Sequence, residues 1–495
     1  MSLVIIQDTS LTWVMVFCPR HRWIVCEPWW MRSVPPVDEG PAKIAVIGAG
    51  ISGLSAAIHA RKLGADVHLF EASPRVGGWI RTSRSDSWTL EWGPNSILPS
   101  SHCLIDLARR VGLESQWQNA ERCARKRFIW KDGALRALPS SPLTIPFSRA
   151  LSPAGWCRFL MEPWIGRGGC EEESVSTFFR RRFGSEAARV LADVMVSGVS
   201  GGRAEWLEID SFQPKLRQWE KQYGSVISGL LRSRSAPSAP LRRTATLAEG
   251  LEQLPRALAA ELADRCHLES PVVALEPHNG GWRLQQGGAY SSDTVDVDGV
   301  ILAIPATPAA TLLQPLSSRA GEMLQSIPYA SLTVVQIGYD ASKCRIRPEG
   351  FGFLVPSSES LGILGTIWSS SLFPSRCPAG ASLATVFIGG SRQPEQIDES
   401  DTMLQDRAIG ALRTAQGIDL DPHMVQLRRA PRSIPQPHRG HRRKVAALRD
   451  ELKRWPALAM AGSHLDGLSL ESCARSGRDA AYQVYSVLNR EEGSP

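Results

Sequence analysis

The sequence contains no uninterrupted apolar run of the roughly 18–20 residues that a membrane-spanning helix needs. None of its ten cysteines lies at CxxC spacing from another, and none forms a Cys/His cluster with the spacing of metal ligands. Charge of one sign is not dominant, since 56 Lys and Arg stand against 49 Asp and Glu. We therefore expect no transmembrane helix, no disulfide framework, no metal site and no nucleic acid as partner.

The bulk composition is that of a globular protein. At 495 residues the chain is long enough for two or three domains, and 43% hydrophobic with 21% charged residues is typical of soluble proteins. The net charge of +7 suits an anionic ligand or an anionic lipid surface. Scattered free thiols favour a reducing compartment, so we expect a cytoplasmic or plastid-type location and no secretion.

Residues 1–40 differ from the rest of the chain. The apolar stretch Leu11 to Phe17 is broken by Pro19, and no small-residue cleavage site follows, so it does not resemble a signal peptide. It is also not rich in serine, as a transit sequence would be. We predict a disordered extension, or a start assigned upstream of Met31, and give it no function.

A βαβ unit is predicted from Lys43 to Glu71. Ile44 to Ile47 form a continuous apolar run, as expected for a strand buried on both faces of a parallel sheet. Apolar residues then recur at helical spacing, and Val67 to Phe70 supply a second strand. Similar strand signals return near residues 300 and 458. The sheet is therefore predicted to be assembled from separated segments, with other domains inserted between them.

A glycine motif opens the helix of this unit. Gly48-Ala-Gly-Ile-Ser-Gly53 follows the first strand, and Glu71 ends the second strand 18 residues after Gly53. In such a motif the first glycine makes the tight turn, the second lets a pyrophosphate approach, and the third lets helix and strand pack closely. The helix amino terminus offers N–H groups to phosphates, and Glu71 can accept hydrogen bonds from a ribose. A dinucleotide site is the expected outcome.

Two further segments indicate FAD. Glu71-Ala-Ser-Pro-Arg-Val-Gly-Gly78, continuing to Thr82, resembles the second phosphate-contacting motif of the FAD-dependent amine oxidase and desaturase superfamily. Ala461-Gly-Ser-His-Leu-Asp-Gly-Leu-Ser469 resembles that superfamily's closing flavin-binding motif. The resemblance implies that FAD is held by Gly48, Gly50, Ile51, Ser52, Gly53, Glu71, Ala72, Arg75, Gly77, Gly78, Trp79, Gly93, Pro94, Asn95, Val272, Gly462, Leu468 and Ser469.

Further motifs narrow the resemblance to the protoporphyrinogen oxidase family, in its FAD-dependent, oxygen-using form. They occur in family order and extend the resemblance over residues 43 to about 488. The matching segments are Glu91-Trp-Gly-Pro-Asn-Ser96, Arg127-Phe-Ile-Trp-Lys-Asp-Gly, Ser197-Gly-Val199, Ser369-Ser-Ser-Leu-Phe-Pro374, and Ile434-Pro-Gln436 with Gly440-His441.

The family resemblance implies a reaction and a set of substrate contacts. Protoporphyrinogen IX would lose six electrons through FAD in three cycles, and oxygen would become hydrogen peroxide, in porphyrin, haem and chlorophyll biosynthesis. Arg127 aligns with the arginine that pairs with a substrate propionate. Leu354 and Leu372 align with residues that sandwich one pyrrole ring, Phe387 with an aromatic that stacks on another, and Gly198 with backbone close to the macrocycle. No residue is assigned a certain catalytic role.

The resemblance also implies an architecture. We predict an α/β fold with a Rossmann-type FAD-binding domain built from discontinuous segments, an α+β substrate domain and a helical membrane-associating domain. The FAD-binding domain comprises residues 41–123, 242–309 and 443–490, and the substrate domain comprises 124–138 and 310–442. The helical domain, 139–241, closes with the Ser/Pro-rich loop 232–240.

A peripheral membrane contact is predicted for the helical domain. The segment Arg149 to Arg167 mixes apolar and aromatic residues with Arg158, which suits a helix lying in a membrane interface. An internal amphipathic helix gives the same pattern, and Pro163 interrupts any single long helix. A homodimer is also kept as an option, because the sequence does not determine the oligomeric state.

Three positions depart from the family pattern. The superfamily often has Arg where this chain has Trp79, although Arg81 is a neighbouring cation. A second acidic residue usually stands where Trp92 is, and an aromatic where Pro437 is. Two rival functions therefore stay open. One is a flavin amine oxidase or carotenoid desaturase, and the other is a flavoprotein that binds tetrapyrrole without turnover.

Overall fold

The computed structural model describes residues 40–85, 87–233, 241, 243–287, 293–344, 348–417 and 421–489, together with three strands near the amino terminus. It divides into two units, Met1–Ala42 and Lys43–Pro495. In the first unit, β1 (Leu3–Asp8), β2 (Leu11–Cys18) and β3 (Arg22–Val25) form an antiparallel sheet. Residues 1–40 are predicted to be a disordered extension, whereas these three segments form strands, which their β-branched and aromatic residues favour.

A five-stranded parallel sheet forms the centre of the second unit. Its order is β12-β5-β4-β16-β22, and every neighbouring pair is parallel. This confirms the predicted α/β class and the assembly of the sheet from separated segments, whereas the domain bounds stay predictions. The strands are β4 (Lys43–Ile47), β5 (Asp66–Phe70), β12 (Cys266–His267), β16 (Gly299–Leu302) and β22 (Leu458–Met460).

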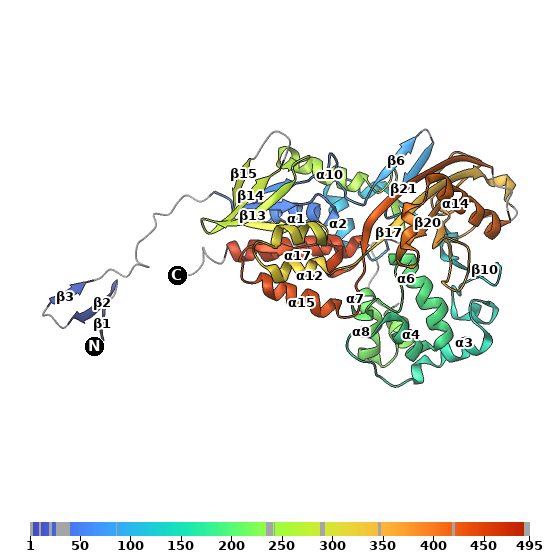
Figure 1. Cartoon of the computed structure of the whole chain (residues 1–495), viewed down its shortest axis with the longest axis horizontal. Helices are drawn as coiled ribbons and strands as arrows, with labels where there is room; N and C mark the ends of the chain where they lie inside the picture. Colours follow the sequence, from blue (N-terminus) through green and yellow to red (C-terminus); the bar gives the residue numbers. More distant parts are fainter. Residues whose placement is uncertain are drawn as a thin grey trace. The chain divides into compact units, whose positions relative to one another are not determined.

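Two helices far apart in the sequence lie side by side on this sheet (Figure 1). They are α1 (Ile51–Lys62) and α17 (Leu470–Leu488). A Cβ at Gly477 of α17 would overlap the backbone oxygen of Ser52, so the helices approach at backbone distance. The same core includes α2 (His102–Arg110) and α10 (Gln253–Leu262).

The other face of the parallel sheet carries a second core. A three-stranded antiparallel sheet and three helices cover it. They are β13 (Val272–His278), β14 (Gly281–Gln286), β15 (Thr294–Val297), α11 (Ala306–Leu313), α12 (Ser318–Gln325) and α15 (His441–Leu452).

A seven-stranded sheet of order β10-β9-β18-β19-β20-β17-β21 forms the other large layer. It contains the predicted antiparallel segments between 312 and 390. Helix α14 (Asp401–Gln416) covers one face, and we call the opposite face the front face. Its strands are β9 (Phe128–Lys131), β10 (Ala134–Ala137), β17 (Tyr329–Asp340), β18 (Gly352–Leu354), β19 (Gly365–Ile367), β20 (Ala381–Gly389) and β21 (Pro422–Pro435).

Residues 150–233 form a separate group of helices, the helical cluster, drawn in green in Figure 1. A π-helical turn, η6 (Ala188–Ala192), leads directly into α6, and residues 234–240 of the predicted boundary loop lie outside the described residues. No helix in the described part of the chain has the length and hydropathy that crossing a bilayer requires. The α-helices are α3 (Pro153–Leu160), α4 (Val175–Phe183), α5 (Ser185–Ala187), α6 (Asp193–Ser200), α7 (Ile209–Phe212), α8 (Pro214–Tyr223) and α9 (Val226–Ser233).

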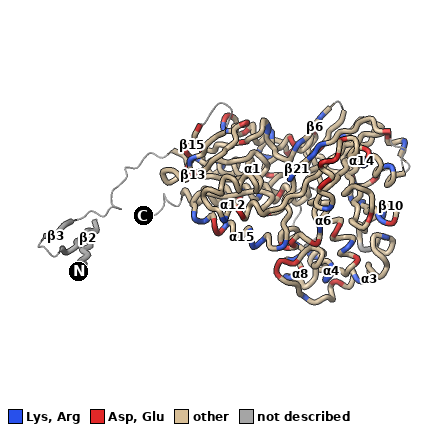
Figure 2. The backbone as a smooth tube through the Cα atoms, in the orientation of Figure 1, with Lys and Arg blue, Asp and Glu red and all other residues tan. Residues whose placement is uncertain are grey.

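A buried ionic network holds the helical cluster together. Acidic and basic residues alternate closely around α4 and α8 (Figure 2). Glu162 and Arg182 are both fully buried, and the Arg182 Nε donates to Glu162 Oε1 over 2.7 Å. The remaining Glu162 oxygen accepts from the Ser225 hydroxyl at 2.6 Å. Every charge is paired and hydrogen-bonded, which is what makes such burial tolerable.

Replacing Glu162 by Gln should destabilise the protein by about 3 kcal/mol or more, because the buried Arg182 charge loses its closest carboxylate and retains Glu220 at 3.5 Å, which two other arginines already share. The change is measured as the shift in the urea unfolding of the purified protein followed by circular dichroism. Asp450→Asn, which breaks the exposed pair with Lys453, is the matched control and should leave unfolding unchanged. Equal effects of the two substitutions would refute a stabilising role for the network.

Candidate functional site

The three glycines at the start of α1 meet three different surroundings. A Cβ at Gly48 would lie 2.6 Å from the Ala303 oxygen, and a Cβ at Gly53 would overlap the Gly48 oxygen. A Cβ at Gly50 would meet no atom within 4 Å. Two glycines thus permit backbone packing, while the third borders open space at a helix amino terminus, where a pyrophosphate can approach. The residues present therefore fit a dinucleotide.

Glu71 lies beside this open space. Its Oε2 accepts from the Ala49 N–H at 2.7 Å, and its Oε1 accepts from the Ser73 N–H at 2.9 Å. The backbone oxygen of Glu71 accepts from Ser270, two residues before Val272 of β13. Ala72 is exposed next to Glu71. The structure therefore brings these predicted contacts to one edge of the sheet, where a ribose and adenine would lie.

The second glycine motif packs directly onto the first. The Gly77 N–H donates to the Ala49 oxygen at 2.8 Å, and Gly77 bridges to Gly50. The Arg75 guanidinium donates to the carbonyls of Val76 at 3.0 Å and Ile80 at 3.2 Å, and to that of Gly78. Burial lowers the pKa of Arg75. The Arg75 side chain therefore holds the loop by its backbone carbonyls, and Gly78 and Trp79 stay exposed.

A buried carboxylate supports the segment Glu91 to Ser96, which follows the hairpin of β6 (Thr82–Ser85) and β7 (Trp88–Glu91). Glu91 accepts from the Thr82 hydroxyl at 2.9 Å and from the Leu251 N–H at 2.8 Å. Burial raises its pKa, and the neighbouring Arg376 opposes this shift.

Arg376 links this segment to the seven-stranded sheet. It is fully buried and donates to Asn95 Oδ1 at 3.2 Å and to the Asn95 backbone oxygen at 2.7 Å. A Cβ at Gly93 would overlap the Trp79 oxygen, so Gly93, Pro94 and Asn95 lie against the second glycine motif. Sequence reasoning missed Arg376, because no pattern marks an arginine whose partners lie hundreds of residues away.

The closing motif is held by the last helix. The Gly462 N–H donates to the Ser476 hydroxyl at 3.1 Å, and the φ of +148° at Gly462 disfavours other residues. His464 in α16 (Ser463–Asp466) is buried, and burial lowers its pKa to about 4. Ser469 caps α17 by accepting from the Ser472 N–H at 3.0 Å. Leu468 packs against the core of the helical cluster.

Two of the predicted substrate residues share the front face. Leu354 pairs with Gly365, and Gly365 pairs with Phe387 on the next strand. Residues paired across neighbouring strands project from the same face of a sheet. Phe387 packs beside Trp92 there, and Leu354 packs against the helical cluster. Between their strands Gly365 has no side chain, so the Leu354 side chain can lie over its backbone.

Gly198 joins this face from the helical cluster. A Cβ at Gly198 would lie 2.6 Å from Leu354 Cδ1, and a Cβ at Gly365 would lie 2.7 Å from Leu354 Cδ2. Leu354 therefore fits between two glycines, one on α6 and one on β19. Sequence reasoning predicted Gly198 but missed Gly365, whose signal is only its position in a short strand. We call this apolar surface of Leu354, Gly365 and Phe387 the slot.

Leu372 and Arg127 lie beside Phe351 and Ile367, at the ends of β18 and β19 that lead to Leu354 and Gly365. Leu372, at the end of α13 (Ser369–Leu372), is fully buried in a small cluster against which Phe351 and Ile367 pack. The Arg127 guanidinium stacks on the Phe351 ring at 4.8 Å, and partial burial lowers its pKa. Among the described residues no carboxylate pairs with Arg127, so its guanidinium is available to bind the carboxylate of a ligand.

Two of the three departures have structural roles. The Trp92 Nε1–H donates to the Ser83 hydroxyl at 2.8 Å, and Arg428 stacks on its ring at 5.2 Å. Pro437 accepts from the Glu208 N–H at 2.8 Å, which ties β21 to the helical cluster. Trp92 therefore does not replace the acidic residue usual at its position, and Pro437 does not replace the usual aromatic.

Comparison with known proteins identifies the family and the fold. The family model of flavin containing amine oxidoreductases matches residues 51–485. The chain is 33% identical over 488 residues to a protoporphyrinogen oxidase of Homo sapiens, covering 91% of this chain and 99% of the relative. It is 27% identical to a coproporphyrinogen III oxidase of Bacillus subtilis, covering 91% and 100%.

A solved structure shares the fold. The protein from Exiguobacterium sp. 255-15 superposes with a TM-score of 0.77 at 24% identity, covering 90% of this chain and 98% of that chain. The family match, residues 51–485, spans most of the sequence and includes the last three residues of the first glycine motif, the slot and the closing motif. The chain belongs to the flavin containing amine oxidoreductase family, groups within it with the protoporphyrinogen oxidases, and is an FAD-dependent oxidoreductase.

Proposed function

We propose that this protein oxidises protoporphyrinogen IX to protoporphyrin IX. The observation that carries the proposal is the position of the slot. Leu354 of the slot and Leu468 of the closing flavin motif both pack against the same core of the helical cluster. The apolar surface and the closing flavin motif thus border one group of helices, which supports a flat macrocycle binding near the flavin, as an oxidase of such a substrate requires.

The residues at the dinucleotide site can hold FAD in full. Gly50 and the start of α1 leave room for the pyrophosphate, and Glu71 offers acceptors to the ribose. Gly78, Trp79 and Asn95 would continue the FAD site towards Gly462 and Leu468. We propose that all the residues implied by the three motifs contact FAD. When bound, FAD supplies hydride acceptance and passes electrons to oxygen in pairs.

The chain's own task is to orient the substrate. Arg127 would pair with a propionate at the side of the slot, since its guanidinium has no carboxylate partner among the described residues. Leu354 and Phe387 would contact the pyrrole rings, and Gly198 would allow close approach from α6. The overall change removes six electrons and six protons from the substrate, and three molecules of oxygen take them up as three of hydrogen peroxide.

The helical cluster and the segment just before it expose apolar side chains that suit a membrane surface. Phe147 is 85% exposed and Trp164 is 79% exposed, and Leu160 and Met161 lie between them in sequence. The predicted amphipathic segment is only partly available, because Trp156 is buried in the core of the cluster. We propose that these four exposed residues rest on the lipid surface from which a poorly soluble substrate enters.

Gly50→Val should abolish FAD binding without unfolding the protein. Gly50 has a φ of −68°, which any residue adopts, and its Cβ would point into free space that the pyrophosphate needs. FAD per protein after purification should fall to less than about a tenth, with an unchanged circular dichroism spectrum. Gly166→Val, at another glycine with free surroundings, is the control and should keep its FAD. A fully loaded Gly50→Val protein would contradict the cofactor position.

The reaction itself is tested by mixing the FAD-loaded protein with protoporphyrinogen IX without oxygen. The flavin absorbance should bleach and then recover when oxygen enters, with porphyrin fluorescence and three peroxides for each porphyrin. Coproporphyrinogen III is the comparison substrate, and its kcat/KM should be at least about tenfold lower. Its two additional carboxylates would lose water against apolar residues of the slot.

Three outcomes would overturn this assignment. The flavin could stay oxidised with protoporphyrinogen while amines or carotenes reduce it, which points to the rival oxidases. It could stay oxidised with all of them while porphyrin still binds, which points to a protein without turnover. Finally, a higher kcat/KM for coproporphyrinogen III would give the protein the activity in the name of its Bacillus subtilis relative.

The membrane contact is tested with the double variant Phe147→Glu and Trp164→Glu. It should bind vesicles of phosphatidylcholine and phosphatidylglycerol at least about tenfold more weakly in sedimentation, because it removes two exposed aromatic groups and adds like charge. Met403→Glu, at an exposed apolar residue of α14, is the control and should bind as the unmodified protein does. Equal binding by all three proteins would contradict the proposed surface.

A further inference from the structure

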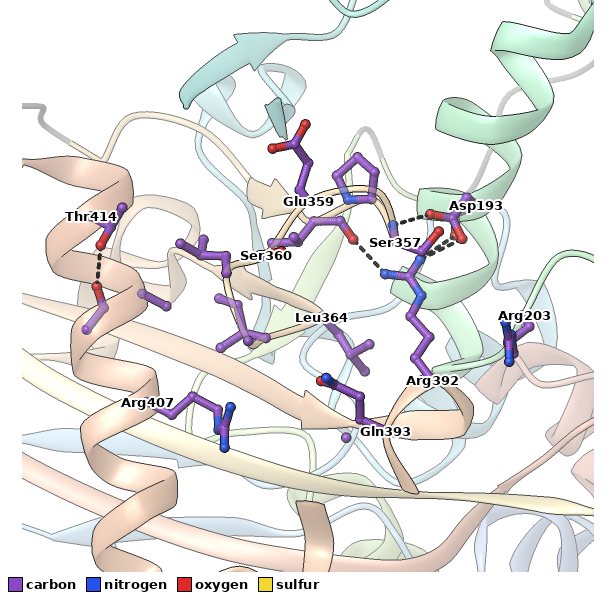
Figure 3. A pocket seen from close by; sticks show the side chains of 18 of the residues that line it. Asp193, Arg203, Ser357, Glu359, Ser360, Leu364, Arg392, Gln393, Arg407 and Thr414 are labelled. Carbon is purple, nitrogen blue, oxygen red and sulfur yellow. Dashed lines mark hydrogen bonds and ion pairs between the residues drawn. The ribbon is translucent and has the colours of Figure 1, made fainter. Parts of the chain in front are cut away.

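A buried ion pair joins the start of α6 to the turn that follows β20, and a hydrogen bond joins it to the loop that follows β18 (Figure 3). Asp193, the first residue of α6, contacts Arg392 Nη2 through Oδ1 at 2.8 Å. Its Oδ2 accepts from the Ser357 N–H at 2.6 Å. The side chains are only 7% and 13% exposed. Both carboxylate oxygens of Asp193 are therefore committed to groups of the seven-stranded sheet and its loops.

Arg392 extends this link to the slot. Its Nη1 donates to the Val355 oxygen at 2.7 Å, and its Nη2 also donates to the Asp193 backbone oxygen at 3.3 Å. Val355 directly follows Leu354 in the chain. One guanidinium thus joins the start of the helix that carries Gly198 to the residue that follows Leu354. Gly198 and Leu354 are themselves in contact in the slot.

The local structure makes this link necessary. Helix α6 follows directly on the π-helical turn η6, where the helix contains one residue more than the α-helical repeat allows. Gly198 itself offers no side chain with which to hold its distance from Leu354. The separation of these two residues therefore depends on contacts made at both ends of α6. Asp193 makes them where the π turn ends, and at the other end the Ser200 carbonyl accepts from the Gln436 side chain at 2.9 Å and the Gly201 carbonyl accepts from the Ser391 N–H at 2.7 Å.

The neighbourhood of the pair leaves room for movement. A cavity of about 800 Å³ adjoins it, lined by Asp193, Arg392 and the loop from Val355 to Leu364. Figure 3 shows the ion pair on one side of this cavity and Arg407 on the other. Arg407 packs against this loop at Gly362, whereas the first residues of the loop border the cavity and would be free to shift if the ion pair were broken.

We propose that Asp193 and Arg392 are positioning residues that set the width of the substrate slot. The pair holds α6 at a fixed distance from the end of β18, so that Leu354 stays between Gly198 and Gly365. This inference rests on the proposed function of the slot and adds two residues to it. Neither residue touches the bound macrocycle, and both act through Leu354 and Gly198.

The test uses three variants of the FAD-loaded protein. Asp193→Asn keeps the shape and the acceptor for Ser357 but removes the charge, Arg392→Met removes the guanidinium, and Arg392→Lys restores the charge without the fork. KM for protoporphyrinogen IX should rise roughly tenfold in the first two, with kcat within about twofold, because ground-state and transition-state binding are lost alike. Arg392→Lys should lie between them and the unmodified protein.

A second readout does not depend on turnover. Quenching of tryptophan fluorescence by protoporphyrin IX gives a Kd, which should rise by the same factor as KM. The double variant Asp193→Asn with Arg392→Met should be no weaker than either single one, because both remove the same link. FAD content and the thermal midpoint are followed alongside, and Arg407→Gln, which breaks the pair with Glu399 across the cavity, is the control.

The outcomes separate the two proposals. A raised Kd in the pair's variants and not in Arg407→Gln supports the positioning role, even where protoporphyrinogen proves not to be turned over. Unchanged KM and Kd in Asp193→Asn and Arg392→Met would overturn it, and so would an equal rise in Arg407→Gln. Additive effects in the double variant would also overturn it, since the residues would then act separately.

Discussion

Backbone approach that only glycine permits is the constraint on which the cofactor site depends. Gly53 lies against the Gly48 carbonyl, and Gly477 lies against that of Ser52. A side chain at either position would push α1 away from the sheet or α17 away from α1. The amino terminus of α1 would then no longer point its N–H groups into the space beside Gly50, and the closing motif before α17 would move with its helix.

The slot repeats this principle between layers of the fold. Gly198 and Gly365 belong to a helix and a strand far apart in the sequence, and together they leave a place for Leu354. The contact is useful only if the helical cluster is rigid and correctly placed. The buried pair of Glu162 and Arg182 holds the helices of the cluster together. Arg392, through Asp193, holds the start of α6 to the seven-stranded sheet. Charged groups thus secure an apolar surface.

The sequence predicted what local patterns encode. The glycine spacing of 48–53, the acidic Glu71 and the apolar strands gave the cofactor site and the parallel sheet, because turns and strand burial depend on neighbouring residues. It did not reveal Arg376 or Gly365, whose roles arise from contacts between distant segments. For the segment Arg149 to Arg167 it left open a membrane contact and an internal helix, and Trp156 is in fact buried, since an amphipathic pattern shows that a helix has an apolar face and not what covers that face.

The helical cluster connects the proposed membrane contact to the slot. Its outer side exposes Trp164, and its inner side carries Gly198 against Leu354. A substrate that dissolves poorly in water would move from the lipid surface to the flavin along one structural unit. Such a unit must resist deformation when lipid contacts its outer side, or the slot would change width. A core in which Glu162, Arg182 and their hydrogen-bond partners are all buried provides this resistance, because every displacement would break charge-assisted bonds.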